Sequence, residues 1–486
     1  MRPIIFASRR VRILPAAIGC SLAVGLAGCT SGPNFAPPTA PRVNTYLHGK
    51  TPAVISPGKN EPEQRLASGR AITGQWWGLY RSKRLDEVLQ QALQHSPDLA
   101  AARETLVAAR EAVIQARGGY FPQVDVSGRA SRDATGPGTN DLYSVGATIY
   151  YVPDLFGASR RAVEQQQALA DYQYYQLAAA WLSLTGNVVT EAINIASTRQ
   201  QIAALKEIIA NDQQDLRLVN LKYEAGKVAR VDVLSAESQL ANDRTQLPPL
   251  QQQLSQARHA LAVLVGRFPG EWSPPDFDLA EFTLPAQLPL QVPSVLVHQR
   301  PDILAAEARL HADSAAIGVT ASQLYPNLTL SANFGSQSAS MATLFQGGSN
   351  FWNLVGNLTA PLFHAGALQA QKRAAVATFR ASAARYEQTV LAAFGQVADT
   401  LRALAHDGDL VAAQQQALDT SDQLVRLQRL SYAAGKSDLL QLLDAERRYQ
   451  QARLGYARAQ AQRFQDSTQL LLAMGGGWSA GPGVRE

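Results

Sequence analysis

The sequence predicts an α+β membrane protein with an internal duplication: a trimeric 12-stranded transmembrane β-barrel, with four strands from each chain, continuous with a long periplasmic α-helical barrel. Three observations predict this fold class. A long repeat divides the chain into two similar halves, each half carries two alternating stretches of strand length, and each half holds a long proline-free stretch rich in Ala, Gln and Leu. Such strands and helices in one chain indicate a membrane-crossing part and an elongated helical part.

The repeat joins two copies that lie about two hundred residues apart. Tyr223-Glu-Ala-Gly226-Lys227 returns 209 positions later as Tyr432-Ala-Ala-Gly435-Lys436, and Tyr120-Phe121-Pro122 returns 204 positions later as Leu324-Tyr325-Pro326. The two offsets differ by five, so one copy carries a five-residue insertion between Pro326 and Gly366. A repeat of this length is a duplicated half-protein with pseudo-twofold symmetry rather than a short solenoid unit.

Residues 1–28 predict a signal peptide. Four arginines precede an apolar stretch from Ile13 to Leu26 that is too short for a membrane span. The following Leu26-Ala27-Gly28-Cys29 resembles the lipobox of bacterial lipoproteins, which implies S-diacylglycerol and N-palmitoyl groups on Cys29. An ordinary secretory cleavage site, or modification at Cys20, is the alternative. By the same resemblance, Thr30 in place of aspartate favours the outer membrane.

Removal of the signal peptide changes the charge of the chain. It deletes four arginines and no acid, so the formal net charge falls from +5 to +1. The basic character therefore belongs to the signal, which argues against nucleic acid as a partner. With Cys29 acylated the mature chain has no free thiol, so neither a disulfide nor a cysteine metal site is expected. The covalent lipid is the only expected prosthetic group.

Each half contains two stretches in which apolar and polar residues alternate with the period of a β-strand. The predicted strands are about 123–131 and 142–152, then 327–335 and 350–360. Each has about ten residues, the length that a tilted strand needs to cross a bilayer. Two water-facing hairpins packed on a helical core are the alternative. Because open sheet edges are not tolerated in lipid, the chain must assemble, and three copies give a barrel wide enough for water.

Long helices are predicted on either side of two glycine turns. Gly157 to about Tyr223 gives a helix of about 66 residues, or about 100 Å, and Gly366 to about Leu430 gives its counterpart. The chain then returns through helices at about 231–266 and 437–472. Pro248-Pro249 should break the former, and a further helix covers 85–118. An intermolecular coiled coil or a periplasmic helical hairpin would explain these helices but not the strand pairs.

The proline-rich residues 30–75 predict an extended tether, too rigid and polar to join a core. Short motifs then follow in order along both halves: Ser31-Gly-Pro33-Asn-Phe-Ala-Pro37, Gln75-Trp76-Trp77, Pro97-Asp98-Leu99, Pro153-Asp154-Leu155-Phe156-Gly157, Arg300-Pro301-Asp302-Ile303, Ile317-Gly318, Pro361-Leu362-Phe363 and Gly475-Gly476-Gly477-Trp478. With these motifs the chain resembles the TolC-like outer-membrane efflux proteins, and more closely their lipoprotein branch of OprM-like and NodT-like channels. His364 and Gln299 depart from the family pattern and leave the fold assignment intact.

The resemblance implies a passive homotrimeric duct in the cell outer membrane that exports small molecules. It implies docking to a periplasmic adaptor protein and to an inner-membrane pump of the RND or MFS type, which supplies the energy. It also implies an equatorial domain built from segments between the repeats and at both ends of the mature chain. The expected segments are the signal peptide 1–28, the lipidated tether and equatorial segment 29–84, the first repeat 85–266, the linker 267–292, the second repeat 293–474 and the tail 475–486.

The family resemblance also implies a periplasmic gate at the tips of the inner helical hairpins. Matched by position, the gate candidates are Tyr223, Asp232, Tyr432 and Asp444, with Lys227, Arg230, Lys436 and Asp438 as possible partners. A threefold axis would set each aspartate into a ring of like charges, which favours cations in an aqueous pore. Alternatively, the aspartates complement a helix N-terminus and the tyrosines pack between helices.

Two other classes of protein remain as alternatives. An enzyme has little support, because the seven histidines show no ligand spacing and the chain has no nucleophile elbow or phosphate loop. A periplasmic adaptor lipoprotein would need lipoyl-like and β-barrel segments in single copy, whereas this chain repeats its strand pairs. A type I secretion duct would share the channel fold. The exported substrate cannot be read from a passive duct.

Overall fold

The computed structural model describes residues 31–49, 53–56, 62–70, 72–136 and 138–478, which belong to two compact units. The strand unit contains the described residues up to Pro37, together with Val107–Asp171 and Glu307–Arg385. The helical unit contains the described residues of Pro38–Leu106, Tyr172–Ala306 and Tyr386–Glu486. Both repeats contribute to both units, so the units cut across the predicted segments, whose boundaries follow the repeat.

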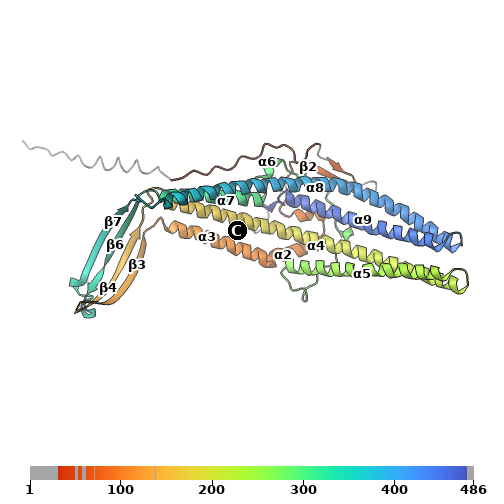
Figure 1. Cartoon of the computed structure of the whole chain (residues 1–486), viewed down its shortest axis with the longest axis horizontal. Helices are drawn as coiled ribbons and strands as arrows, with labels where there is room; N and C mark the ends of the chain where they lie inside the picture. The colour runs from red at the N-terminus through yellow and green to blue at the C-terminus, as the bar shows by residue number, and fades with distance from the viewer. Residues whose placement is uncertain (1–30, 50–52, 57–61, 71, 137, 479–486) are drawn as a thin grey trace, which may run out of the picture. The chain divides into compact units, whose positions relative to one another are not determined.

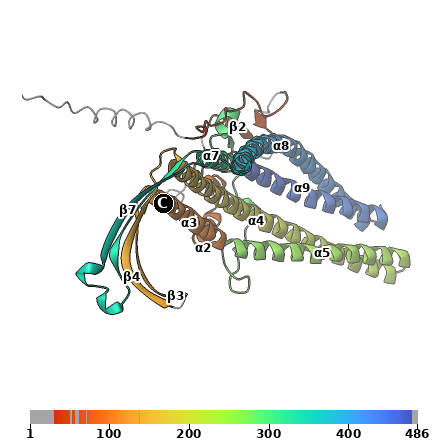
Figure 2. The same cartoon turned by 60° about the vertical axis from the view of Figure 1, so that its left-hand side comes forward.

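The strand unit holds a four-stranded antiparallel sheet in the order β3-β4-β6-β7 (Figure 1). Its strands are β3 Gln123–Thr135, β4 Gly138–Tyr151, β6 Asn327–Ser338 and β7 Asn350–Thr359. Figure 2 shows that the strands curve along their length. Large apolar side chains such as Val126, Trp352 and Leu354 are exposed on this sheet, as expected for strands that face lipid.

The first hairpin is longer than the alternating pattern predicts. β3 continues to Thr135 and β4 begins at Gly138, whereas the predicted strands were 123–131 and 142–152. Arg132 pairs with Asp141 directly across the two strands, and Arg132 Nη2 donates to Asp141 Oδ2 at 2.7 Å. Cross-strand ion pairs support a sheet without any apolar alternation, which is why hydropathy missed this extension.

The helices confirm the predicted lengths. The two long helices, α4 Ala158–Glu224 and α8 Ala367–Ala433, have 67 residues each, and the returning helices, α5 Arg230–Leu264 and α9 Leu439–Ala473, have 35 each. A helix of 67 residues is about 100 Å long. None of the described helices is both long and apolar enough to cross a membrane.

Two helix predictions are wrong, both because of proline. The predicted helix 85–118 is two helices, α2 Lys83–His95 and α3 Pro97–Gly118, since the residue before a proline disfavours the helical conformation and Ser96 is extended with ψ 120°. In contrast, α5 runs unbroken through Pro248 and Pro249. Both prolines are exposed, so water can bind the helix carbonyls that lose their N–H partners.

The predicted tether is also partly wrong, because it contributes to a core. Within residues 30–75, β1 Val54–Ile55 and β2 Gln64–Ser68 form a sheet with β5 Gln287–Leu290 from between the repeats. Gln64 is fully buried, and its Nε2 donates to Pro285 O and Ser467 Oγ. A buried polar side chain is tolerated where it is hydrogen-bonded in this way, which composition alone does not reveal.

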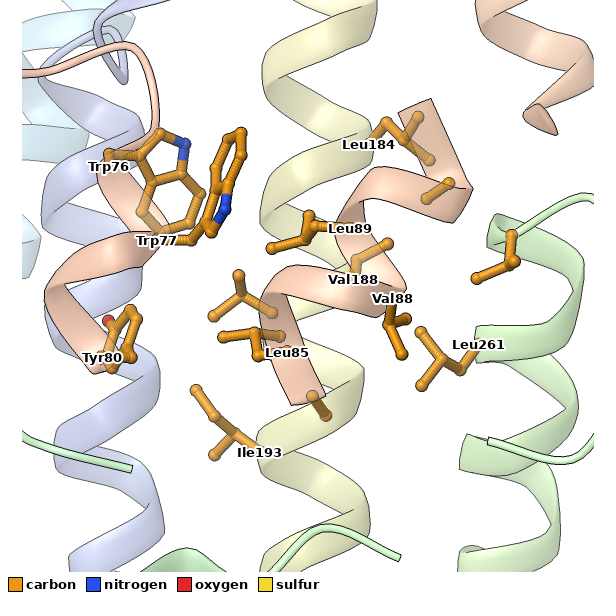
Figure 3. Close-up of a cluster of buried hydrophobic side chains, with 14 of the residues drawn as sticks. Trp76, Trp77, Tyr80, Leu85, Val88, Leu89, Leu184, Val188, Ile193 and Leu261 are labelled. Carbon is orange, nitrogen blue, oxygen red and sulfur yellow. The ribbon is translucent and has the colours of Figure 1, made fainter. Parts of the chain in front are cut away.

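A large hydrophobic cluster fixes the helices of the helical unit against one another. Figure 3 shows Trp76, Trp77 and Tyr80 of the 3₁₀ helix η1 (Trp76–Tyr80) beside apolar side chains of α2, α4 and α5. Trp77 Nε1 donates to Asp86 Oδ1 at 2.9 Å, so its polar atom is satisfied. The motif Gln75-Trp76-Trp77 is therefore explained by packing. Near the C-terminus, Trp478 is also buried and donates from Nε1 to Gln299 O at 2.7 Å.

Candidate channel mouth and N-terminal clamp

The two hairpin tips of the helical unit have the same backbone geometry. In the first tip, Gly226 has φ 67° and Lys227 N donates to Lys222 O at 2.8 Å. In the second, Gly435 has φ 70° and Lys436 N donates to Ser431 O at 2.8 Å. This is the usual way for a glycine in the left-handed region to end a helix. The Tyr-x-x-Gly-Lys repeat is therefore the sequence of a helix end followed by a tight turn.

Two of the predicted gate aspartates cap the returning helices. Asp232 Oδ2 accepts from Ala229 N at 2.9 Å at the start of α5. Asp438 is the N-cap of α9, and its Oδ1 accepts from Gln441 N at 2.8 Å. A carboxylate at a helix N-terminus satisfies a free N–H and complements the helix dipole. Helix capping, the alternative to a role in the gate, thus explains the positions of both side chains.

The two predicted gate tyrosines differ. Tyr432 is buried at 4 % exposure, whereas Tyr223 is 42 % exposed. The Nζ atom of Lys222 lies 3.5 Å from the centre of the Tyr432 ring and donates to Tyr432 O at 3.0 Å. Burial, followed by the charges of Asp232 and Asp215, raises the pKa of Tyr432. Lys222 of α4 and Tyr432 of α8 therefore tie the tip of one repeat to the tip of the other.

The remaining predicted gate residues lie on the surface of the tips. Lys227, Arg230 and Lys436 are exposed. Asp444 is half-buried and accepts from two arginines of its own helix, Arg447 and Arg448, the latter at 2.7 Å. Apart from the tie through Lys222, the structure thus spreads the eight candidates over two tips rather than gathering them into one cluster. Sequence reasoning missed Lys222, which directly precedes Tyr223 and has Ser431 as its counterpart.

A buried polar seam lies along the same four helices, further from the tips. It consists of Asp212, Asp215, Asp243, Arg429, Glu446 and Gln450. Gln450 Nε2 of α9 donates to Asp243 Oδ1 of α5 at 2.7 Å, and Arg429 Nη2 of α8 donates to Glu446 Oε1 of α9 at 3.0 Å. Burial, then the neighbouring Asp243, raises the pKa of Asp212 to about 8. Burial, then the neighbouring Asp215, raises the pKa of Glu446 to about 9.

In the strand unit, a second site binds the segment that follows the lipidation motif. Ser31 N donates to Phe156 O at 3.0 Å, and Arg161 donates from Nε to Ser31 O at 3.1 Å and from Nη2 to Asn34 Oδ1 at 2.7 Å. The ring of Phe35 stacks on His311 with centroids 4.4 Å apart. We call these contacts the N-terminal clamp. Cys29 itself lies outside the described residues.

Glu164 and two glycines complete the N-terminal clamp. Glu164 accepts from Arg161 Nη1 at 2.6 Å and pairs with His311 Nε2 at 3.0 Å. Gly32 packs on Gly318 so closely that a Cβ on Gly32 would lie 2.5 Å from the Gly318 Cα. The motifs Ser31-Gly-Pro33-Asn-Phe and Ile317-Gly318 therefore meet in one site, which a sequence reading could list but not connect.

The described residues include no group of three or more His, Cys, Asp or Glu side chains placed to hold a metal ion. The main features of the described chain are a sheet with exposed apolar side chains, two long helical hairpins and their tips.

The comparisons with known proteins agree with this geometry. The family model described as "Outer membrane efflux protein" matches residues 88–267 and 292–476. The chain is 30 % identical over 450 residues to the pyoverdine export outer membrane protein OpmQ of Pseudomonas aeruginosa, covering 89 % of this chain and 94 % of OpmQ. It is 27 % identical over 462 residues to the probable outer membrane lipoprotein SilC of Salmonella typhimurium, covering 93 % and 96 % of the two chains. The structure of the outer-membrane channel OprN matches with a TM-score of 0.83 at 25 % identity, covering 93 % of this chain and 100 % of OprN.

Fold and comparisons together define an outer-membrane channel, and the predicted fold class is confirmed. The chain belongs to the outer membrane efflux protein family. It is the outer-membrane component of a tripartite efflux system, in which channels of this family work as trimers with an adaptor and an inner-membrane pump. The channel class, rather than the adaptor class, is the one confirmed.

Proposed function

We propose that this chain forms a passive, lipid-anchored duct for small molecules whose periplasmic mouth is closed by the hairpin tips. The observation that carries the proposal is the contact of Lys222 with Tyr432, which holds the tips of the two repeats together. Tyr223, Lys227, Arg230 and Lys436 are exposed at these tips, where they are available to neighbouring protomers. Asp232, Asp438 and Asp444 place carboxylates beside these basic side chains. The duct has no catalytic role of its own.

Conductance in planar lipid bilayers tests the proposed mouth. Lys222→Met keeps the aliphatic stem and removes the charge over the Tyr432 ring, a contact of about 1 to 2 kcal/mol in a partly buried site. We expect the closed state of Lys222→Met channels to leak more current than that of the wild type. Lys206→Met is the matched control, because it removes the same charge from an exposed position of the same helix, α4, away from the tip. Equal closed-state currents in wild-type and Lys222→Met channels would contradict the proposal that the hairpin tips close the mouth through this contact.

We also propose that Cys29 carries the diacylglycerol and palmitoyl groups. Two observations support this. SilC, a relative along nearly the whole chain, is described as a probable lipoprotein. The N-terminal clamp holds Ser31, two residues after Cys29, through Phe156, which lies five residues beyond the end of β4. Two residues span at most about 7 Å. The clamp would therefore hold the lipid on Cys29 near the end of the sheet at which β4 ends.

Mass spectrometry of the mature N-terminus tests the lipid. We expect a triacylated peptide that begins at Cys29, its loss in Cys29→Ala, and its persistence in Cys20→Ala. An unmodified N-terminus, or a peptide that begins at Cys20, would contradict the assignment.

We propose as partners a periplasmic adaptor and an inner-membrane pump of the RND or MFS type. The name of OpmQ, a pyoverdine exporter, supports the export of small molecules. A type I secretion duct remains the second candidate. Cross-linking in whole cells followed by identification of the inner-membrane partner separates the two, because a secretion duct would be linked to an ABC-type exporter.

A further inference from the structure

Two pairs of carboxyl groups are buried in the polar seam of the helical unit. Asp212 of α4 neighbours Asp243 of α5, and Glu446 of α9 neighbours Asp215 of α4. Asp212, Asp243 and Glu446 are 5 %, 2 % and 6 % exposed. Two neighbouring ionised carboxylates repel each other in a buried site, and a proton held by one member of the pair removes that repulsion.

The unpartnered atoms of the seam point to the same protons. Asp212 Oδ2 and Glu446 Oε2 are buried and receive no hydrogen bond from an N–H or O–H of any described side chain or backbone. A buried acceptor without a donor is costly, and a proton on either member of each pair removes that cost. The seam thus has two places for a bound proton that its amide and guanidinium neighbours do not fill.

The charges around the seam do not balance without protons. Asp212 and Asp215 come from α4, Asp243 from α5 and Glu446 from α9, while Arg429 of α8 is the cation that faces them among the described residues. Arg429 Nη2 is 3.0 Å from Glu446 Oε1 and 4.0 Å from Asp215 Oδ2, so its positive charge lies beside the pair of Glu446 with Asp215. Asp232 and Tyr432 lie nearer the tips and add no cation. Four ionised acids would repel one another in a low-dielectric interior.

The seam connects the hairpin of one repeat to that of the other. The pair of Glu446 with Asp215 joins α9 to α4, and the bond from Gln450 to Asp243 joins α9 to α5. The pair of Asp212 with Asp243 joins α4 to α5 and therefore lies within one hairpin. Ionisation of both Glu446 and Asp215 would place two like charges at the interface of the two hairpins.

We propose that a proton shared between Glu446 and Asp215 latches the two hairpins together in the closed channel, so that loss of the proton favours opening. The proposal deepens the proposed function, since it rests on the tips being the mouth. Glu446 and Asp215 act here as positioning residues, because their effect on transport passes through the packing of the two hairpins.

The direction of the pH effect follows from the raised pKa of Glu446. A carboxyl group whose pKa is higher in the latched state than in the hydrated, open state favours the latched state fully at low pH, where the group is protonated in both states. As the pH rises above the ordinary carboxyl range near 4, the group ionises in the open state alone, so the latch weakens until the pH reaches about 9. Opening should therefore become easier with rising pH over this window.

Single-channel recording at pH 5 to 9.5 tests the latch. We expect the open fraction of the wild type to rise by about tenfold or more between pH 6 and pH 9, since one pKa unit of difference corresponds to a factor of ten. The variant Glu446→Gln carries a neutral side chain of the same shape that can donate a hydrogen bond to Asp215, so its open fraction should be low and nearly constant with pH. The melting temperature of the trimer verifies that the variant is folded.

Asp407→Asn is the matched control for the latch. Asp407 is also buried, and burial followed by the neighbouring Asp466 raises its pKa to about 8, but this pair joins α8 to α9 within one hairpin. Asp407→Asn channels should therefore follow the wild-type pH dependence. The same holds for Asp212→Asn, because Asp212 and Asp243 lie within the other hairpin. A pH-independent wild type, or a Glu446→Gln variant with wild-type pH dependence, overturns the latch. If Lys222→Met still raises the closed-state current in that case, the proposed mouth is supported and only the latch is wrong. If Lys222→Met leaves the current unchanged, the proposed mouth is wrong as well.

Discussion

The Nζ atom of Lys222 in α4 lies 3.5 Å from the centre of the Tyr432 ring in α8, at the point where both long helices end. Tyr223, the corresponding tyrosine of the first repeat, is exposed. The duplication therefore provides two similar hairpins, and the differences between the copies decide how their tips interact. Ser431 occupies the position of Lys222 in the second repeat, so the second repeat has no lysine for the reciprocal contact with Tyr223.

Removal of one candidate aspartate from each repeat, Asp232→Ala with Asp444→Ala, should change the cation selectivity or the closed-state conductance in planar bilayers, because it removes negative charge from each hairpin. The two single variants should differ in stability. Asp232→Ala deletes a helix cap and should cost about 1 kcal/mol. Asp444→Ala deletes ion pairs to exposed arginines and should cost nearly nothing. Unchanged selectivity and unchanged current in the double variant would remove these aspartates from the gate.

Replacement of the prolines inside α5 should stabilise the protein. Pro248→Ala with Pro249→Ala restores two backbone donors in an exposed helix, where proline is up to about 3 kcal/mol less favourable than alanine. We expect a higher melting temperature of the trimer in circular dichroism. Pro97→Ala is the control, because Pro97 is also exposed and is the first residue of α3, where proline is well tolerated. A lower melting temperature of the double variant would mean that the prolines have a packing role at this point.

Truncation of Trp77 should destabilise the helical unit strongly. Trp77 is buried in the large hydrophobic cluster, so Trp77→Ala should cost about 3 to 5 kcal/mol. Conversion of trimer to monomer on heating, followed by gel electrophoresis, measures the loss. Phe268→Ala removes another aromatic ring at 74 % exposure and should leave the transition within about one degree of the wild type. Similar losses in both variants would indicate that the cluster is not the core of this unit.

A side chain at Gly318 should release the segment held by the N-terminal clamp. A Cβ at Gly318 would lie 2.7 Å from Ser31 O and from Arg161 Cγ, so Gly318→Val has no room. A spin label on Ala36→Cys should become more mobile in this background by electron paramagnetic resonance. Gly118→Val serves as the control, because no atom of the described chain lies within 4 Å of a Cβ built there. An immobile label in Gly318→Val would show that other contacts hold the segment.

The main elements could be predicted from the sequence because their signals are local. The absence of proline and the paired glycines predicted both 67-residue helices, and alternation predicted all four strands of the sheet. Proline misled in both directions, since Ser96 ends a helix before Pro97 while α5 passes through Pro248. The effect of a proline depends on the exposure of the neighbouring carbonyls, which a sequence pattern does not contain.

The polar seam and the N-terminal clamp could not be predicted because their partners are far apart in the chain. Asp243 meets Gln450 from 207 positions away, and Arg161 meets Asn34 from 127 positions away. In a helix rich in Ala and Gln, a buried acid such as Asp212 looks the same as a solvated one. The gate candidates were implied by the family resemblance, but whether each one caps, packs or faces solvent depended on tertiary contacts.

A double-mutant cycle on Lys222 and Tyr432 tests the central claim most directly. The closed-state conductance in planar bilayers is measured for the wild type, Lys222→Met, Tyr432→Leu and the double variant. If the two residues tie the tips together, either single change raises the current and the double variant leaks no more than the leakier single variant. Effects that add independently, or single variants that conduct as the wild type does, would contradict the claim that this contact closes the channel.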